Sequence, residues 1–158
     1  MRLSQEWTEA LERWCDVHVE PVFYRGQCLI HRAELMVMQG YWSQALREIH
    51  RACVRLSRPR SHPALGSAFY LRADLHRLRG EFDEAEGAYR QASTWGHHQP
   101  QPGLALLRLA QGRIEEADSA VRRAISLVAD DDIDRCKLLG PRVETALALG
   151  DYLLALDG

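Results

Sequence analysis

The stretch GEFDEAEGAYRQA, from Gly80 to Ala92, combines a glycine with small and bulky side chains at helical spacing. Ala85, Tyr89 and Ala92 are four and then three residues apart, which places all three on one face of a helix. A face that reads small, large, small lets a second helix approach closely at the alanines, while the tyrosine fills the space between them. Gly80 can end a preceding helix in the left-handed conformation without steric cost, so we expect a helical hairpin that turns there.

The same pattern recurs along the chain, as a glycine followed by a bulky residue and then an alanine. The copies are GYWSQA at Gly40 to Ala45, GEFDEA at Gly80 to Ala85, GRIEEA at Gly112 to Ala117, GDYLLA at Gly150 to Ala155, and a weaker QEWTEA at Gln5 to Ala10. A second helical stretch precedes each of the four glycines, which lie 40, 32 and 38 residues apart. The repeating unit is therefore expected to be two antiparallel helices.

These spacings and offsets resemble those of tetratricopeptide repeat (TPR) proteins, whose repeat is about 34 residues long. The resemblance covers nearly the whole chain, and GEFDEAEGAYRQA carries it most clearly. More narrowly, the segments YRGQCLIHRAEL, GSAFYLRADLHRLRGEFDEAEGAYRQAS and QPGLALLRLAQGRIEEA are similar to the TPR region of large LuxR-family transcription regulators of actinobacteria. The resemblance implies an all-α fold, a TPR-like α-solenoid of antiparallel helix pairs.

One domain is expected over the 158 residues. Its helix pairs are predicted at residues 21–57, 62–96 and 102–129, with partial repeats at 4–18 and 136–157. The segments RPRSHP, after Ser57, and ADDDID, from Ala129, have loop compositions. We also expect Pro100 and Pro102 to shorten the helix that follows them, and Gly140 with Pro141 to interrupt the last one early.

Composition argues against several classes of function. A net charge of −2 gives no basic footprint for nucleic acid, and no P-loop motif GxxxxGK[ST] occurs. The first residues are charged throughout, and no apolar run approaches the ~20 residues of a membrane span. Four cysteines without a CxxC spacing fit reduced thiols. We therefore expect a cytoplasmic protein that binds neither nucleic acid nor membrane.

Catalytic and metal sites are not predicted. Cys28 and His31 lie on one helical face, and His97 and His98 are adjacent in a loop, but zinc takes four ligands, or three and a water. Neither pair has the third group that would complete a nucleophilic site. We expect no enzyme activity, no metal and no cofactor.

The resemblance does imply a binding groove, because the first helix of each pair lines the concave side of such solenoids. By the family's offsets the groove residues are Gln27, Ile30, Glu34, Val37, Ser67, Tyr70, Asp74, Arg77, Leu106, Leu109 and Glu144. Three carboxylates at equivalent offsets, with Tyr70 one turn before Asp74 and free to stack on a guanidinium, suit a partner that carries Arg or Lys. Two alternatives stay open: these residues are only a solvated surface, or Asp74 pairs with Arg77 one turn along its own helix.

The expected function is a non-enzymatic protein–protein interaction module, a TPR scaffold that serves as a regulatory or sensory segment of a transcription regulator. The alternative is a regulatory domain that senses a small molecule. Apolar residues are concentrated in both terminal helices, so we also expect either self-association through a terminal helix or docking of segments from a longer parent protein. The apolar residues are Trp7, Leu11 and Trp14 at one end, and Tyr152, Leu153 and Leu154 at the other.

Overall fold

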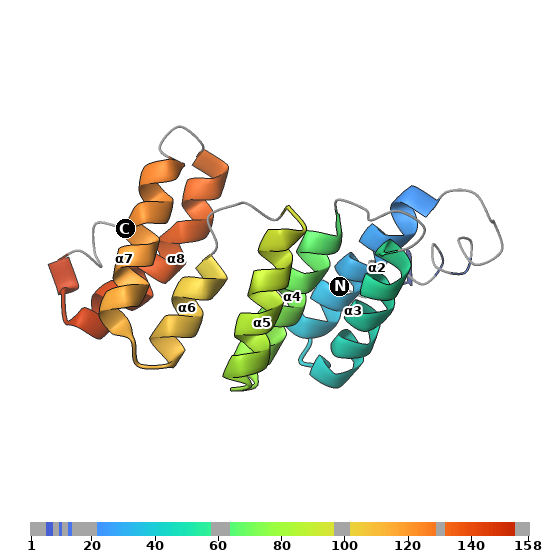
Figure 1. The fold of residues 1–158 in the computed structure, drawn as a ribbon, viewed down its shortest axis with the longest axis horizontal. Helices are drawn as coiled ribbons and strands as arrows, with labels where there is room; N and C mark the ends of the chain where they lie inside the picture. The colour runs from blue at the N-terminus through green and yellow to red at the C-terminus, as the bar shows by residue number, and fades with distance from the viewer. Residues whose placement is uncertain are drawn as a thin grey trace.

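A computed structural model describes residues 22–57, 64–96, 102–128 and 132–153, together with positions 6, 7, 10 and 13. The described residues form α-helices joined by turns and contain no strand, which confirms the all-α class (Figure 1). The helices are α2 (Val22–Met38), α3 (Trp42–Leu56), α4 (Ala64–Leu78), α5 (Phe82–Thr94), α6 (Pro102–Ala110), α7 (Ile114–Leu127) and α8 (Asp132–Leu149).

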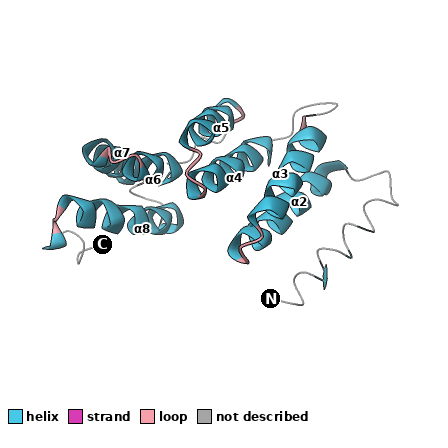
Figure 2. Ribbon diagram, turned by 90° about the horizontal axis from the view of Figure 1, so that it is seen from below, coloured by secondary structure: helices cyan, strands magenta, loops and turns pink. Residues whose placement is uncertain are grey.

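The helices are arranged as hairpins that stand in a row. α2 packs on α3, α4 on α5 and α6 on α7, and α8 packs against α6 and α7 at the end of the row. The first helices of successive hairpins touch one another, α2 with α4, α4 with α6, and α6 with α8. Each second helix also contacts the first helix of the next hairpin, as α3 does with α4. Figure 2 shows α5 and α7 on one side of the row and α4 and α8 on the other.

Four turns share one geometry. Gly40, Gly80, Gly112 and Gly150 all have a positive φ, between 76° and 81°. At the second of them, the N–H of Gly80 donates to the carbonyl of Arg77 at 3.0 Å, and the next N–H donates to the carbonyl of His76 at 2.9 Å. The same two bonds recur at the other three glycines. This is the Schellman motif, which needs a left-handed residue, so the predicted role of the glycines is confirmed.

The predicted small, large, small face is the buried face of each second helix. In α5, Ala85, Tyr89 and Ala92 are all 0% exposed. The corresponding residues of α3 and α7 are also buried: Ala45, Ile49, Ala52, Ala117, Val121 and Ala124. The faces of α3 and α5 each meet a buried alanine of the preceding helix, Ala33 and Ala73, and Ala105 of α6 is buried as well. Small residues on both helices let the two backbones approach closely, while Tyr89 and its counterparts fill the core.

The last helix differs from the expectation. α8 begins at Asp132, inside the predicted loop, and continues through Gly140 and Pro141 without interruption. A proline inside a helix costs about 3 kcal/mol, while each large apolar side chain that becomes buried contributes about 1.5–3 kcal/mol. Leu138 and Ala146 are fully buried, and α8 packs against both α6 and α7. Tertiary packing therefore outweighs the local cost of the proline.

The shortened helix after the prolines is confirmed, because α6 starts at Pro102 and has 9 residues, whereas α4 has 15. Proline is well tolerated at the first position of a helix, because an N–H at that position would have no hydrogen-bond acceptor within the helix.

At the ends of the chain, Trp7, Tyr152 and Leu153 are strongly exposed. Leu11, Trp14 and Leu154 lie outside the described residues. Within the described part of the chain, no helix has both the length and the apolar character that a membrane crossing needs.

Candidate functional site

The exposed sides of α2, α4, α6 and α8 form what we call the first-helix surface, which contains the predicted groove residues. Between α2 and α4 it is hollowed into a cleft of about 350 Å³. The cleft is lined by Gln27, Ile30, His31, Glu34, Ala64 and Ser67. Four of the eleven predicted residues thus meet at one place.

The polar end of the cleft is built by consecutive turns of α2. His31 Nδ1 lies 3.0 Å from Glu34 Oε2, and both side chains are largely exposed. Ile30, by contrast, is 4% exposed and packs in the core with Leu29 and Leu65, so it forms the floor of the cleft. A carboxylate beside an imidazole, above an apolar floor, can accept hydrogen bonds from a ligand and cover its apolar part.

Asp74, predicted to continue the row of carboxylates, forms hydrogen bonds with two other side chains of the protein. The Tyr89 hydroxyl donates to Asp74 Oδ1 at 2.6 Å, and Arg77 Nη2 lies 3.4 Å from the same oxygen. The alternative in which Asp74 pairs with Arg77 is therefore present in the structure. Tyr89, which comes from α5, contributes the shorter of the two contacts.

Tyr70 connects α4 to α6. Its hydroxyl accepts a hydrogen bond from the backbone N–H of Gly103 at 3.0 Å. Its ring meets that of Tyr89 edge to face, with the centroids 5.4 Å apart. Burial raises the pKa of both hydroxyls, and the negative charge of Asp74 raises it further, so both stay protonated at neutral pH. Tyr70 thus differs from the expectation that it is free to stack on a guanidinium, because its hydroxyl and ring already make contacts between helices.

Two more of the predicted groove residues are partly buried. Val37 packs against the core cluster around Ala33 and Ile49. Arg77 has a side chain that is only 18% exposed, and its Nε is buried with no hydrogen-bond partner. Sequence offsets alone could not separate these positions from truly exposed ones.

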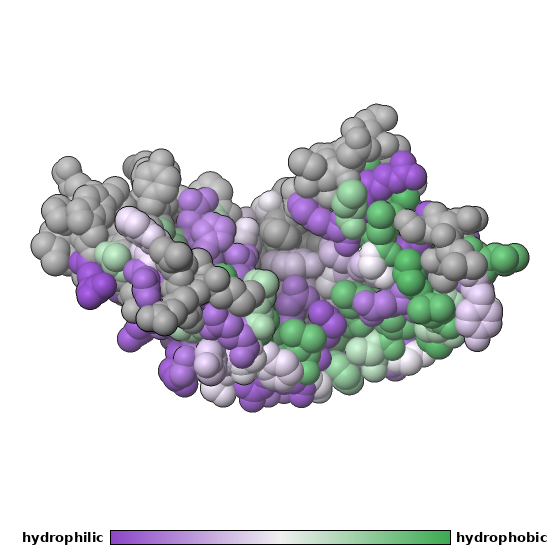
Figure 3. Space-filling view, turned by 180° about the vertical axis from the view of Figure 1, so that it is seen from behind, coloured by the Kyte–Doolittle hydropathy of each residue, from purple (hydrophilic) through white to green (hydrophobic). Residues whose placement is uncertain are grey.

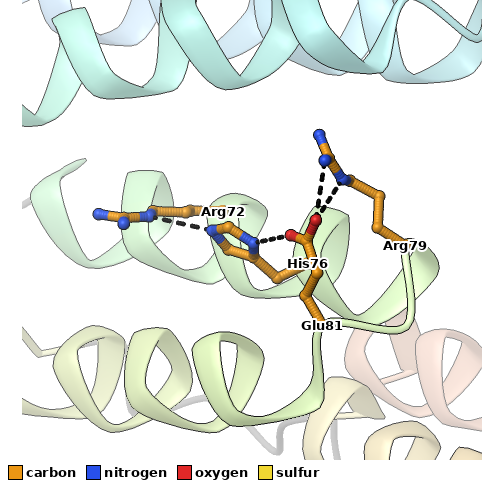
Figure 4. A network of polar contacts seen from close by, with 4 residues as sticks. All are labelled: Arg72, His76, Arg79 and Glu81. Atoms are coloured by element: carbon orange, nitrogen blue, oxygen red, sulfur yellow. Dashed lines mark hydrogen bonds and ion pairs between the residues drawn. The ribbon is translucent and has the colours of Figure 1, made fainter.

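A second polar cluster ties α4 to the turn that follows it (Figure 4). Arg72 Nε donates to His76 Nε2 at 3.4 Å, and His76 Nδ1 lies 2.6 Å from Glu81 Oε2. Arg79 Nε donates to the other oxygen of Glu81 at 2.8 Å. The hydrogen bond from His76 lowers the pKa of Glu81, and the charge of Arg79 contributes. Both nitrogens of the buried imidazole are engaged, so the cluster holds the turn in place and offers no free base.

The far end of the first-helix surface is largely apolar, although it also carries the exposed carboxylate of Glu144. Leu106 and Leu109 on α6 are partly exposed, while Glu144 on α8 is exposed. Leu147, three residues after Glu144 on α8, is 50% exposed. Figure 3 shows hydrophobic side chains gathered over the end that α6, α7 and α8 form. The first-helix surface is therefore polar between α2 and α4 and apolar toward α8.

Two residues of this surface were missed by the sequence analysis, although each has a signal. Leu147 comes three residues before its turn glycine, as Val37, Arg77 and Leu109 do. His31 stands one helical turn before Glu34 on the same face. A search by distance from each glycine would have found Leu147, and a search for i, i+3 polar pairs would have found His31.

Among the described residues, no group of three or more His, Cys, Asp or Glu side chains is placed to hold a metal ion. Cys28, Cys53 and Cys136 form no disulfide, and burial raises the pKa of Cys53, which makes it a weaker nucleophile. His97 and His98 lie outside the described residues.

Comparison with known proteins adds no assignment. Neither a scan against protein-family models nor a search of curated protein sequences finds a match to this chain. The resemblance to TPR proteins therefore stays a prediction, supported by the repeated residues and by the hairpins described above.

Proposed function

We propose that this chain is a non-enzymatic interaction scaffold, a TPR-like α-solenoid that holds a segment of a partner protein on its first-helix surface. One observation carries the proposal: four first helices end in the same turn and touch one another in order. Repeated helix pairs that stack in this way create an extended surface, which such proteins use for binding.

The chemistry of the surface supports one kind of partner segment. Glu34 and its cleft suit an Arg or Lys side chain, because a carboxylate forms its strongest hydrogen bonds with such groups. Leu106, Leu109 and Leu147 suit apolar side chains at the other end. The preferred partner is thus an amphipathic segment with a basic residue toward α2 and apolar residues toward α8.

The biological setting follows from the resemblance to LuxR-family regulators. In that setting the chain is a cytoplasmic regulatory or sensory segment of a transcription regulator. It receives a signal by binding a protein, and it makes no direct contact with nucleic acid.

A selection experiment tests this function. The immobilised chain is used to select binders from a random peptide library, and peptides enriched in Arg or Lys are expected. Glu34→Lys should weaken the best peptide about tenfold, a loss that equals about 1.4 kcal/mol. Glu84→Lys, an exposed residue on α5 with the same change of charge, is the control and should have little effect. Peptides without basic residues, or equal losses in both variants, would contradict the proposal.

The volume of the cleft supports one alternative function. At about 350 Å³ it reaches the lower end of the range of small-molecule sites, about 300–1,000 Å³, so a sensor of a small polar ligand is a second candidate. A thermal-shift screen against metabolites separates the two. A metabolite that raises the melting temperature of the wild type but not of Glu34→Lys would favour the sensor.

A further inference from the structure

His31 lies in the cleft between α2 and α4, beside the carboxylate that the proposed function assigns to a basic side chain. Of the six residues that line this cleft, only His31 and Glu34 can carry a charge near neutral pH. The other four are Gln27, Ile30, Ala64 and Ser67. The charge of the cleft lining is therefore decided by this pair alone.

The two side chains are close enough to interact and open enough to exchange protons with the solvent. His31 Nδ1 lies 3.0 Å from Glu34 Oε2. The side chain of His31 is 73% exposed, and that of Glu34 is 47% exposed. A neutral imidazole beside the carboxylate leaves the pair with a negative charge, whereas a protonated imidazole makes the pair neutral overall.

The corresponding carboxylates of the other hairpins do not have a titratable residue at the same offset. Leu71 stands three residues before Asp74, and Pro141 stands three residues before Glu144. Neither of these side chains can take up a proton. An imidazole one turn before the carboxylate is thus particular to α2, the helix that contributes four of the six lining residues.

The helices that pack on α2 add no titratable side chain to the cleft lining in the described part of the chain. From α4 come only Ala64 and Ser67, and from α3 comes none. In α4, Arg72 Nε donates to His76, and Asp74 accepts a hydrogen bond from Tyr89.

Two further groups near His31 lie outside the lining. On α2 itself, Cys28 and Arg32 stand within one turn of His31 but do not line the cleft. In α3, Cys53 packs against the core cluster that contains Ile30, and burial raises the pKa of its thiol, which therefore stays neutral. Protonation of His31 is thus the event that changes the charge of the cleft between neutral and mildly acidic pH.

We propose that His31 makes partner binding at this cleft depend on pH, so that a basic segment binds at neutral pH and is released in mild acid. The inference rests on the proposed function, because both concern the carboxylate of Glu34. Histidine is the side chain that ordinarily gains its proton as the pH falls from about 8 to about 5. Once protonated, His31 pairs with Glu34 and competes with the Arg or Lys of the partner for the same oxygens. Affinity for a basic segment is therefore full above this pH range and falls through it.

The probe is an amidated peptide of alternating arginine and leucine with a rhodamine dye on its N-terminus, so that no group of the peptide titrates near neutral pH. Its anisotropy is measured with the full chain at about pH 7.5 and about pH 5.5, at constant ionic strength. The wild type should bind about threefold more weakly at the lower pH, an effect of the size that an exposed ion pair gives.

Two asparagine variants locate the effect. His31→Asn should bind equally well at both pH values, because asparagine stays neutral. His50→Asn replaces an exposed histidine of α3 that does not line the cleft, and as the matched control it should keep the pH dependence of the wild type. Unchanged circular dichroism and melting temperatures of both variants exclude a folding defect.

The outcomes separate this inference from the proposed function. If Glu34→Lys weakens binding at about pH 7.5 but the wild-type affinity is the same at both pH values, the inference fails and the proposed function stands. The inference also fails if His31→Asn keeps the full pH dependence, or if His50→Asn removes as much of it. No binding at either pH, or equal affinities of the wild type and Glu34→Lys, would overturn the proposed function and the inference together.

Discussion

At the scale of single residues, Gly103 fixes how closely two hairpins approach. A Cβ added at this position would collide with the Tyr89 ring, whose Cε1 would be only 2.6 Å away. The N–H of the same glycine donates to Tyr70. Two tyrosines from the second hairpin thus meet the start of α6 at a residue that has no side chain. A larger residue here must push α6 away from α4 and α5.

Gly103→Ala should therefore destabilise the protein by about 1–3 kcal/mol, as overpacking does elsewhere. Gly140→Ala is the matched control, because both glycines are helical and a Cβ at Gly140 would meet nothing within 4 Å. Because alanine has a better helix propensity than glycine, Gly140→Ala should stabilise the protein by up to about 1 kcal/mol. Urea unfolding measures both variants. Equal stabilities would mean that the contact at Gly103 is not as tight as described.

Glu116 gives a pH-dependent prediction. Hydrogen bonding from Arg113 holds the pKa of Glu116 below its ordinary value of 4.5. A lowered carboxyl pKa stabilises the fold above that ordinary value, and the contribution is lost as pH falls through the folded-state pKa. Glu116→Gln should thus lower the melting temperature slightly at about pH 7, and the difference should vanish near pH 2. A difference that is the same at both pH values would contradict this role of the ion pair.

At the scale of helices, the hairpin depends on local features that can be recognised in the sequence. A glycine with positive φ ends one helix, and alanines at helical spacing let the next helix pack against it. These features depend only on neighbours in sequence, so the turns and the buried faces could be predicted. The continuation of α8 through Pro141 could not, because it depends on packing against α6 and α7.

The candidate site was harder to predict for the same reason. The bond between Tyr89 and Asp74 joins two helices and spans 15 residues, so no offset within one helix reveals it. Glu34 and Asp74 have the same offset from their glycines, yet Glu34 borders a cleft and Asp74 is bonded internally. Repeat periodicity predicts which face a residue occupies, whereas its partners depend on side chains from neighbouring helices.

Ala85→Leu tests the packing of the helix pair. Ala85 is fully buried where α5 crosses α4, so a leucine there should overpack the contact and cost about 1–3 kcal/mol. Ala110→Leu, at an exposed position of α6, is the control and should change stability by less than about 0.5 kcal/mol. Chemical unfolding of the two variants decides the matter. An Ala85→Leu midpoint equal to that of the wild type would argue against close packing of α4 on α5.

At the scale of the whole molecule, surface regions of different character are distributed over one row of hairpins. The first-helix surface is polar near Glu34 and apolar near Leu147. A row of hairpins can display such surfaces far apart without a shared core. This arrangement suits a protein that brings other proteins together.

Self-association is expected at the α8 end, where Leu147, Leu149, Tyr152 and Leu153 are all exposed. Burying apolar side chains is favourable by about 25 cal/mol per Å², so these residues should pair when the concentration rises. Light scattering should show a mass that grows with concentration, and Leu153→Glu should reduce that growth. A clean monomer at high concentration would contradict the expectation.

Hydrogen–deuterium exchange, measured with and without the best basic peptide from the library selection, tests the central claim most directly. If the first-helix surface binds the partner, exchange should slow in residues 27–37 and 67–77, and the outer sides of α5 and α7 should not change. Glu34→Lys should abolish the protection at the same peptide concentration. Protection confined to α3, α5 or α7, with none in α2 and α4, would contradict the account.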